Sequence, residues 1–339
     1  MPGIWTRGVA VLAALLLVLA SCGDDDTDDA SDPSSDPDPE TVDETDGDDT
    51  ADPVAVALSE PGDVLAASLS CPDERRHPEV PGVLLVPGTG LGSEDAFSLT
   101  LVPALEAEGH DVCTVDLVDS ATGDITRSAE HVVAAIRTMN DQGYDEVAVV
   151  GFSQGVLAAR WALTFWPDVR EPVTDLVGVA GPSGGAATTA PLCADAPCAA
   201  ALHQMTAGSA FLTALDDAWP DLDSIAVTLI ASDSDTVVAV DEVDAVPGAN
   251  LVLVQDVCEA REVDHVAMLA DAVVFEVILD AVSNDGTASA ERIDSEVCGG
   301  TDIGADGWDA DAVNDAAFGV ILTAAVVEDE PPLPAYAAS

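Results

Sequence analysis

The residues best placed to do chemistry form the pentapeptide Gly151-Phe152-Ser153-Gln154-Gly155. It follows an apolar run at 146–150, expected as a buried strand, and precedes a helical pattern at 154–166. A serine between small residues at such a strand-to-helix turn is typical of the G-x-S-x-G nucleophile elbow. Free N–H groups and the helix dipole there favour a developing oxyanion. The pattern predicts that Ser153 is a nucleophile; the alternative is a purely structural turn.

A serine nucleophile needs a histidine base, and in hydrolases with this elbow the chain order is serine, acid, histidine. Three of the five histidines precede Ser153, and a fourth lies in an expected helix before the next strand. These four are His77, His110, His131 and His203. We therefore predict that the base is His265, which lies at a loop-to-helix junction.

The acid of such a triad is expected at the end of a strand between Ser153 and His265. The apolar run at 225–231 ends in Ser232-Asp233-Ser234-Asp235. An aspartate there would orient the imidazole and stabilise its cation. Spacing alone leaves Asp233 and Asp235 as alternatives.

The loop Gly88-Thr89-Gly90, which follows an apolar run at 83–86, is expected to supply a second oxyanion donor. Its glycines also suggest a dinucleotide loop, but the pattern G-x-G-x-x-G fails at Ser93 and no helix opens directly after it. Cys193 and Cys198 have no histidine at metal-ligand spacing. The sequence therefore predicts neither a cofactor nor a metal.

Apolar runs and amphipathic segments alternate along the chain, which predicts an α/β fold with a mainly parallel central sheet flanked by helices. Together with the elbow and the order of the triad candidates, this indicates an α/β-hydrolase fold. Strands are expected at 83–86, 111–117, 146–150, 174–180, 225–231 and 251–254. Helices are expected at 99–108, 126–141, 154–166, 199–217, 265–282 and 311–327.

The amino-terminal region predicts export. Arg7 precedes an apolar run at 9–20 that is typical of a signal peptide, so residues 1–21 are assigned to one. Leu19-Ala20-Ser21-Cys22 matches a bacterial lipobox, which predicts lipidation of Cys22; the alternative is an ordinary signal peptide. Residues 22–63 are expected to be a disordered acidic tether, because 23–53 holds 15 acidic residues and no basic or aromatic one. Residues 64–339 are assigned to the hydrolase domain.

The charge balance excludes some partners. The 339 residues include 64 acidic side chains, nine arginines and no lysine, for a net charge of −55. Nucleic-acid binding needs clustered basic residues, so it is not expected. A hydrophobic content of 48% nevertheless requires a folded core. We expect a monomer in the cell envelope, held on the outer face of the membrane by a lipid anchor, or else secreted.

Five separated segments resemble the Candida antarctica lipase B-like family of α/β-hydrolases, which are serine lipases and esterases. They occur in one order between residues 70 and 310 and are 86–90, 152–167, 206–215, 235–238 and 263–265. The resemblance implies that the acid is Asp235 rather than Asp233. It implies Thr89, through its N–H and hydroxyl, and Gln154, through its N–H, as oxyanion donors.

The resemblance also implies disulfide pairs Cys71–Cys113 and Cys258–Cys298, which leaves Cys193–Cys198 as a local pair in a small helical lid region. Phe152 stands where the family has tryptophan, which alters the alcohol side of the pocket. The helix at 311–327 is expected to help build the acyl pocket, or else to be a plain packed helix. Its candidate lining residues are Ala316, Phe318, Val320 and Ile321.

These features predict a serine carboxylic-ester hydrolase, similar to a triacylglycerol lipase, that acts on ester or lipid substrates. It would use Ser153, Asp235 and His265 and form an acyl-enzyme without a cofactor. Alternatives on the same machinery are a polyester depolymerase and a narrow short-chain esterase. An alternative of another class is a non-catalytic lipoprotein that binds an apolar ligand.

Overall fold

A seven-stranded sheet organises the part of the chain that the computed structural model describes, residues 56–194, 196–300 and 302–338. The strand order is β1-β3-β2-β4-β5-β7-β8. Only β1 runs antiparallel to its neighbour, and the other five pairings are parallel. The strands are β1 (Leu69–Ser70), β2 (Gly82–Val86), β3 (Val112–Val115), β4 (Val147–Phe152), β5 (Val173–Val179), β7 (Ala226–Ala231) and β8 (Asn250–Leu253). The predicted mainly parallel sheet is confirmed.

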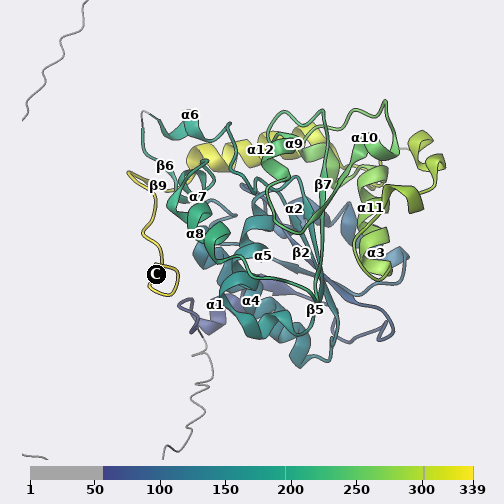
Figure 1. Ribbon diagram of the computed structural model, residues 1–339, viewed down its shortest axis with the longest axis horizontal. Helices are drawn as coiled ribbons and strands as arrows, with labels where there is room; N and C mark the ends of the chain where they lie inside the picture. The colour runs from purple at the N-terminus through teal and green to yellow at the C-terminus, as the bar shows by residue number, and fades with distance from the viewer. Residues whose placement is uncertain (1–55, 195, 301, 339) are drawn as a thin grey trace, which may run out of the picture. The chain divides into compact units, whose positions relative to one another are not determined.

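Both faces of the sheet are buried, so its central strands are predominantly apolar. In β2, Val83 and Leu85 join one core and Leu84 and Val86 join the other, because side chains alternate along a strand. One face is covered by α4 (Ile125–Asp141), α5 (Gln154–Phe165) and α8 (Ala210–Ala218), and the other by α2 (Ser93–Phe97), α3 (Leu101–Ala107) and α11 (Ala272–Ser283). Figure 1 shows α4 and α5 on one side of the strands and α11 on the other.

Two helices expected to be continuous are each divided by a capping residue. The segment expected at 199–217 forms α7 (Ala200–Gln204) and α8, separated at Gly208, whose φ is 77°. Ser209 begins α8 by accepting a hydrogen bond from the N–H of Leu212. The segment at 265–282 forms η2 (Val266–Leu269) and α11, and the Asp271 carboxylate caps α11.

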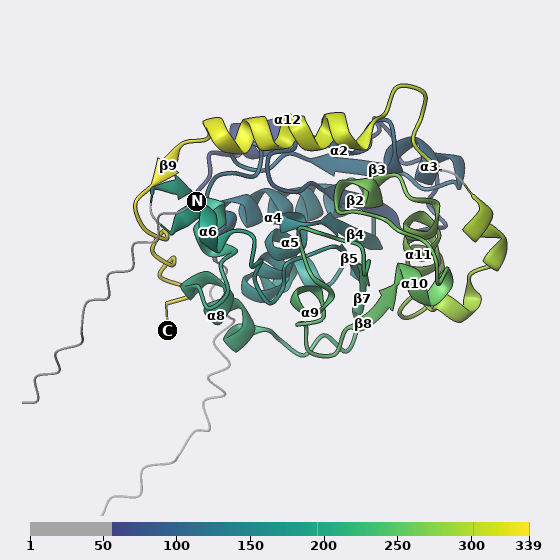
Figure 2. The same ribbon diagram turned by 90° about the horizontal axis from the view of Figure 1, so that it is seen from above.

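A small region beside the sheet combines short helices with a two-stranded ribbon. It contains α6 (Ala190–Cys193), α7 and α12 (Ala310–Thr323), and β6 (Cys198–Ala199) pairs antiparallel with β9 (Val326–Val327). Figure 2 shows α12 along one side of the molecule, with β9 at its end near α6. The ribbon thus ties the end of α12 to the segment that follows α6.

The remaining short elements connect these layers. They are η1 (Pro167–Arg170), α9 (Val240–Val243), α10 (Val254–Val257), η3 (Ala290–Arg292) and η4 (Ser295–Gly299). The structure contains the disulfides Cys71–Cys113, Cys193–Cys198 and Cys258–Cys298. Among the described residues, no helix is long and apolar enough to cross a membrane.

The folded unit begins before residue 64, so the predicted end of the tether at 63 is wrong. The carbonyl of Val56 accepts a hydrogen bond from the Trp166 indole, and Ser59 donates its N–H and hydroxyl to the buried Glu130 carboxylate. Helix α1 (Gly62–Ser68) then follows directly. Residues 56–63 pack because they satisfy polar groups that α4 and α5 would otherwise leave unpaired. The predicted signal peptide, Cys22 and most of the tether lie outside the described residues.

Asp175 in β5 gives the fold a pH dependence. Its side chain is buried, and burial, followed by the charges of Asp285 and Glu146, raises its pKa from 3.8 to about 6. The unfolded chain releases this proton at lower pH, so the group's contribution to stability is lost as pH rises from 3.8 to about 6. We expect Asp175→Asn to raise the free energy of unfolding by about 3 kcal/mol at pH 8 and to leave it nearly unchanged at pH 3.5.

Denaturant unfolding of both proteins at the two pH values measures this difference. Asp175 and Asp223 both line one surface pocket, and Asp223 is exposed. The matched control is Asp223→Asn, which should leave the free energy of unfolding nearly unchanged at both pH values. An equal gain for Asp175→Asn at the two pH values would contradict the assignment.

Candidate active site

Ser153 sits on a sharp turn between β4 and α5. Its backbone has φ 51° and ψ −122°, outside the region that most side-chain-bearing residues adopt. A Cβ on Gly151 would lie 2.7 Å from the N of Val156, and one on Gly155 would collide with the carbonyl oxygen of Val86. Only glycine fits at both positions, so the two glycines allow the turn that lifts Ser153 above the end of the sheet.

A continuous chain of hydrogen bonds joins the serine to an aspartate. His265 Nε2 lies 3.0 Å from Ser153 Oγ, and His265 Nδ1 lies 2.7 Å from Asp235 Oδ2. A carboxylate only accepts, so Nδ1 carries the proton and Nε2 is free to accept from the hydroxyl. The other oxygen of Asp235 accepts from the N–H groups of Val237 and Val238 at 2.7 and 3.0 Å. These bonds fix the carboxylate with one oxygen aimed at His265.

Among the described residues, Asp233 makes no hydrogen bond to His265. It is exposed, and its N–H donates to Gln255 Oε1 at 3.0 Å. Of the two aspartates that spacing left open, the structure brings Asp235 to His265. The side chain of Asp235 is 1% exposed and that of His265 8%, so their contact is largely shielded from water.

The other four histidines have different surroundings. His77 is half-exposed near Glu79, His110 bonds the carbonyl of Pro81, and His203 bonds that of Val327. His131 is buried, and burial chiefly lowers its pKa. None of the four contacts Ser153 through a hydrogen bond within the described residues.

Thr89 and Gln154, whose N–H groups are the expected oxyanion donors, both lie beside Ser153. A Cβ on Gly88 would lie 2.9 Å from the Cβ of Ser153, so the loop that carries Thr89 packs directly on the nucleophile. Gln154 is the first residue of α5, and within the described residues neither its N–H nor that of Thr89 is bonded to an acceptor. Two unpaired donors beside a serine hydroxyl can bind an oxyanion.

The Thr89 hydroxyl is engaged by the Gln154 side chain. It donates to Gln154 Oε1 at 2.8 Å, and its single proton is therefore not free for an oxyanion. Gln154 Nε2 is buried and has no partner among the described residues. A half-turn of the amide would let Nε2 donate to Thr89 Oγ1 and would free the hydroxyl proton.

An apolar cavity of about 320 Å³ opens beside Ser153 and His265. Its wall is mostly hydrophobic, with threonines and one asparagine as the polar exceptions. The wall comprises Thr89, Leu91, Phe152, Pro182, Ala186, Thr188, Thr189, Leu192, Leu202, Met205, Val237, Val238, Val266, Asn314, Ala317, Phe318 and Ile321. The volume and lining suit a small apolar ligand with one polar centre.

The residues of helix α12 that line the cavity differ in part from those expected. Phe318 and Ile321 are in the wall, joined by Asn314 and Ala317 at helical spacing, whereas Ala316 and Val320 lie on the exposed face. The expectation for Ala316 and Val320 is therefore wrong. Thr188 and Val237, which lie in loops, and Leu192, which lies in the short helix α6, were missed because no local pattern tells which short segment folds over a sheet.

The Cys193–Cys198 disulfide lies at one side of this cavity. Leu192 in the wall precedes Cys193, and Cys198 belongs to the strand that pairs with β9. Cys193, Cys198 and His203 are the only group of potential metal ligands that meets within the described residues. Both sulfurs are held in the disulfide, so no thiolate is available there to bind a metal.

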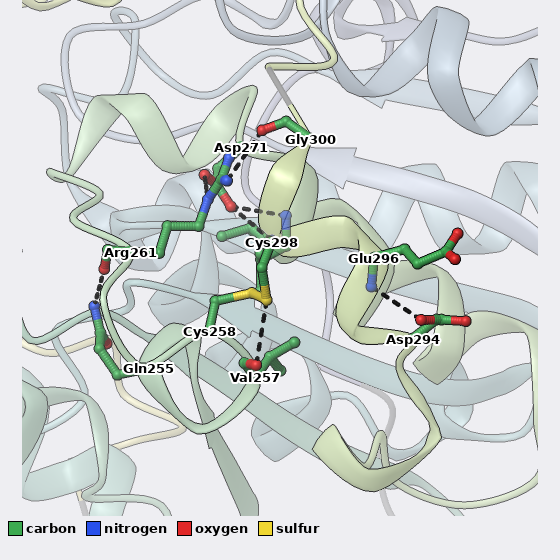
Figure 3. The surroundings of a disulfide bond; sticks show 11 residues. Gln255, Val257, Cys258, Arg261, Asp271, Asp294, Glu296, Cys298 and Gly300 are labelled. Carbon is green, nitrogen blue, oxygen red and sulfur yellow. Dashed lines mark hydrogen bonds and ion pairs between the residues drawn. A yellow bond between two sulfur atoms is a disulfide. The ribbon is translucent and has the colours of Figure 1, made fainter.

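Several bonds brace the loop that carries His265 (Figure 3). The Cys258–Cys298 disulfide ties the start of the loop to η4. Arg261 pairs with Asp271, the residue that caps α11, and donates to the carbonyl of Gly300. Gln255 donates to the carbonyl of Arg261 at 2.8 Å. The base therefore sits on a loop fixed at several points.

The sheet order, the turn at Ser153 and the helices on both faces define an α/β-hydrolase fold. No family model matches the chain. The chain is 32% identical over 183 residues to lipase B of Pseudozyma antarctica, an alignment that covers 54% of each protein. It thus spans about half the length of this curated relative.

Solved structures agree on the fold. Lipase B of Aspergillus fumigatus superposes with a TM-score of 0.73 at 22% identity, over 84% of this chain and 74% of that one. The Bacillus licheniformis lipase BlEst2 in its propeptide form superposes with a TM-score of 0.55 at 15% identity, over 65% of this chain and 54% of that one.

Proposed function

We propose that this protein is a serine carboxylic-ester hydrolase in which Ser153, His265 and Asp235 form the catalytic triad. The observation that carries the proposal is the hydrogen-bonded chain from Asp235 through His265 to Ser153, which ends at an apolar cavity. The 32% identity to a lipase supports the same class of reaction.

In the proposed reaction, Ser153 Oγ attacks the ester carbonyl carbon while His265 Nε2 takes the hydroxyl proton. The N–H groups of Thr89 and Gln154 stabilise the tetrahedral oxyanion. The ester C–O bond then breaks, and His265 gives its proton to the leaving alcohol. Water, activated by His265, attacks the acyl-enzyme in the same way and releases the acid. Asp235 holds the imidazole in the required tautomer and stabilises its cation.

The apolar wall of the cavity supports an ester with an apolar acyl chain as substrate. Long triglycerides, short soluble esters and polyesters all contain the bond that this chemistry breaks. Hydrolysis of an ester series of increasing acyl length would separate a lipase from a narrow esterase, and release of soluble products from a polyester film would identify a depolymerase.

We also propose that the protein is exported, with residues 1–21 as signal peptide and a lipid on Cys22. Three disulfides support an oxidising location. The acidic composition of residues 23–53 supports a solvated linker between the anchor and the hydrolase.

Labelling with a fluorophosphonate tests the proposed mechanism. We expect wild-type protein to gain one adduct on Ser153, with loss of fluoride, and to lose ester hydrolysis in parallel. Ser153→Ala should remain folded and unlabelled. A folded wild-type protein that neither labels nor hydrolyses any ester of the series would identify the chain as a non-catalytic binder and overturn the proposal.

A further inference from the structure

Asp264, the residue just before the proposed base, bonds to both loops of the triad. Its Oδ1 accepts from the N–H of Thr236 at 3.0 Å, from the Thr236 hydroxyl at 3.0 Å and from the N–H of His265 at 2.9 Å. Thr236 directly follows Asp235 in the chain. A single oxygen atom thus joins the residue after the acid to the backbone of the base.

Few other bonds connect these two loops. Gln255 accepts from the N–H of Asp233 and donates to the Ser232 hydroxyl and to the carbonyl of Arg261, so it joins the earlier parts of the two loops. Asp264 joins them next to the triad itself. Without Asp264, only three things would hold Asp235 against His265: the hydrogen bond between them, the bridge through Gln255 and the packing of the two backbones.

The carboxylate of Asp264 is not explained as a helix cap. Helix η2 begins at Val266, and the bonds of the Asp264 side chain go to Thr236 and to His265, which precedes the helix. Partial burial acts to raise the pKa of Asp264, but the donors of Thr236 and His265 together outweigh it and hold this pKa below its ordinary value. The group is therefore an anion, which is the better acceptor for three donors.

We infer that Asp264 is a positioning residue that sets the separation and orientation of Asp235 and His265 by clamping Thr236 to the backbone of the base. This inference rests on the proposed function. It assigns no contact with substrate to Asp264. Its effect on the reaction runs through the geometry of the Asp235–His265 bond, where misplacement by about 1 Å can cost about 100-fold in rate.

Replacing Asp264 by alanine and by asparagine distinguishes the effect of its acceptor oxygen from the effect of its negative charge. Asp264→Ala removes the acceptor, and we expect kcat to fall about 10- to 100-fold with KM within about twofold of wild type. Asp264→Asn keeps an acceptor oxygen at the same place, and we expect it to restore most of the loss. Thr236→Val removes one donor of three at nearly constant volume and should lower kcat about threefold, even if the alanine variant fails to fold.

The matched control is Glu262→Ala, which removes a negative charge from an exposed position of the same loop and should leave kcat unchanged. Proton NMR adds a readout that needs no turnover. The downfield resonance of the His265 Nδ1 proton should persist in Asp264→Asn and Glu262→Ala and should broaden or vanish in Asp264→Ala.

The outcomes separate this inference from the proposed function. Suppose that the wild type hydrolyses esters. The positioning role is then overturned if Asp264→Ala keeps the wild-type kcat, or if Asp264→Ala and Asp264→Asn lose equal activity. It is also overturned if Glu262→Ala loses as much activity as Asp264→Ala. If wild type hydrolyses none, the proposed function falls, and the proton resonance alone decides whether Asp264 orients His265.

Discussion

His265→Ala is expected to lower kcat for ester hydrolysis by about a million-fold, the loss found when the base of a Ser–His–Asp hydrolase is removed. His265 Nε2, 3.0 Å from Ser153 Oγ, is placed to take the hydroxyl proton and to return it to the leaving alcohol. Alanine can do neither, so both acylation and deacylation should fail. The rate that remains would come from the oxyanion donors and from substrate binding.

Single-turnover hydrolysis of an activated ester measures this loss, and the rate of fluorophosphonate labelling gives a second estimate. His77→Ala is the control, because His77 is half-exposed and precedes Ser153 in the chain. It should retain wild-type kcat. An alanine variant at 265 that kept more than about one per cent of wild-type kcat would exclude His265 as the base.

Much of the fold could be predicted because the central strands have a local signal. The runs that became β2, β4, β5 and β7 are predominantly apolar, as is typical of strands buried on both faces; their polar residues are Thr174, Asp175 and Thr228. The two-residue β1 was missed because its antiparallel pairing with β3 depends on a partner more than 40 residues away. The pairing of β6 with β9 is equally non-local and carries no sequence pattern.

The predicted helix boundaries are wrong where a single capping residue starts a new helix within a segment whose apolar residues recur at helical spacing. Ser209 and Asp271 each cap a new helix inside a segment expected to be continuous. The signals were present in the sequence: a glycine before Ser209, and an aspartate two residues before a run of valines. Capping satisfies N–H groups that a buried helix start cannot leave unpaired, so it takes precedence over periodicity.

The candidate site likewise has one part that the local sequence predicts and another part that depends on distant segments of the chain. The elbow at Ser153 could be predicted because its strand, turn and helix are consecutive in the chain. The partners of the serine come from loops that only the sheet order brings together, so spacing could not decide between Asp233 and Asp235. The role inferred for Asp264 had only one sequence signal, its position beside His265, and that position does not say where the side chain points.

The second large effect concerns the acid. Asp235→Asn is expected to lower kcat about 10,000-fold, because the amide would present a donor to His265 Nδ1 and impose the tautomer that carries its proton on Nε2. That nitrogen could then no longer accept from Ser153. The asparagine oxygen could still accept from the N–H groups of Val237 and Val238, so the loop should stay folded.

Asp233→Asn is the matched control, since it makes the same substitution two residues away on an exposed side chain, and it should keep kcat within about twofold of wild type. Measurement of kcat for both variants, with thermal unfolding to verify the fold, compares the two aspartates directly. A large loss in Asp233→Asn together with wild-type activity in Asp235→Asn would reverse the assignment of the acid. That result would require the loop after β7 to turn over in solution and bring Asp233, rather than Asp235, against His265.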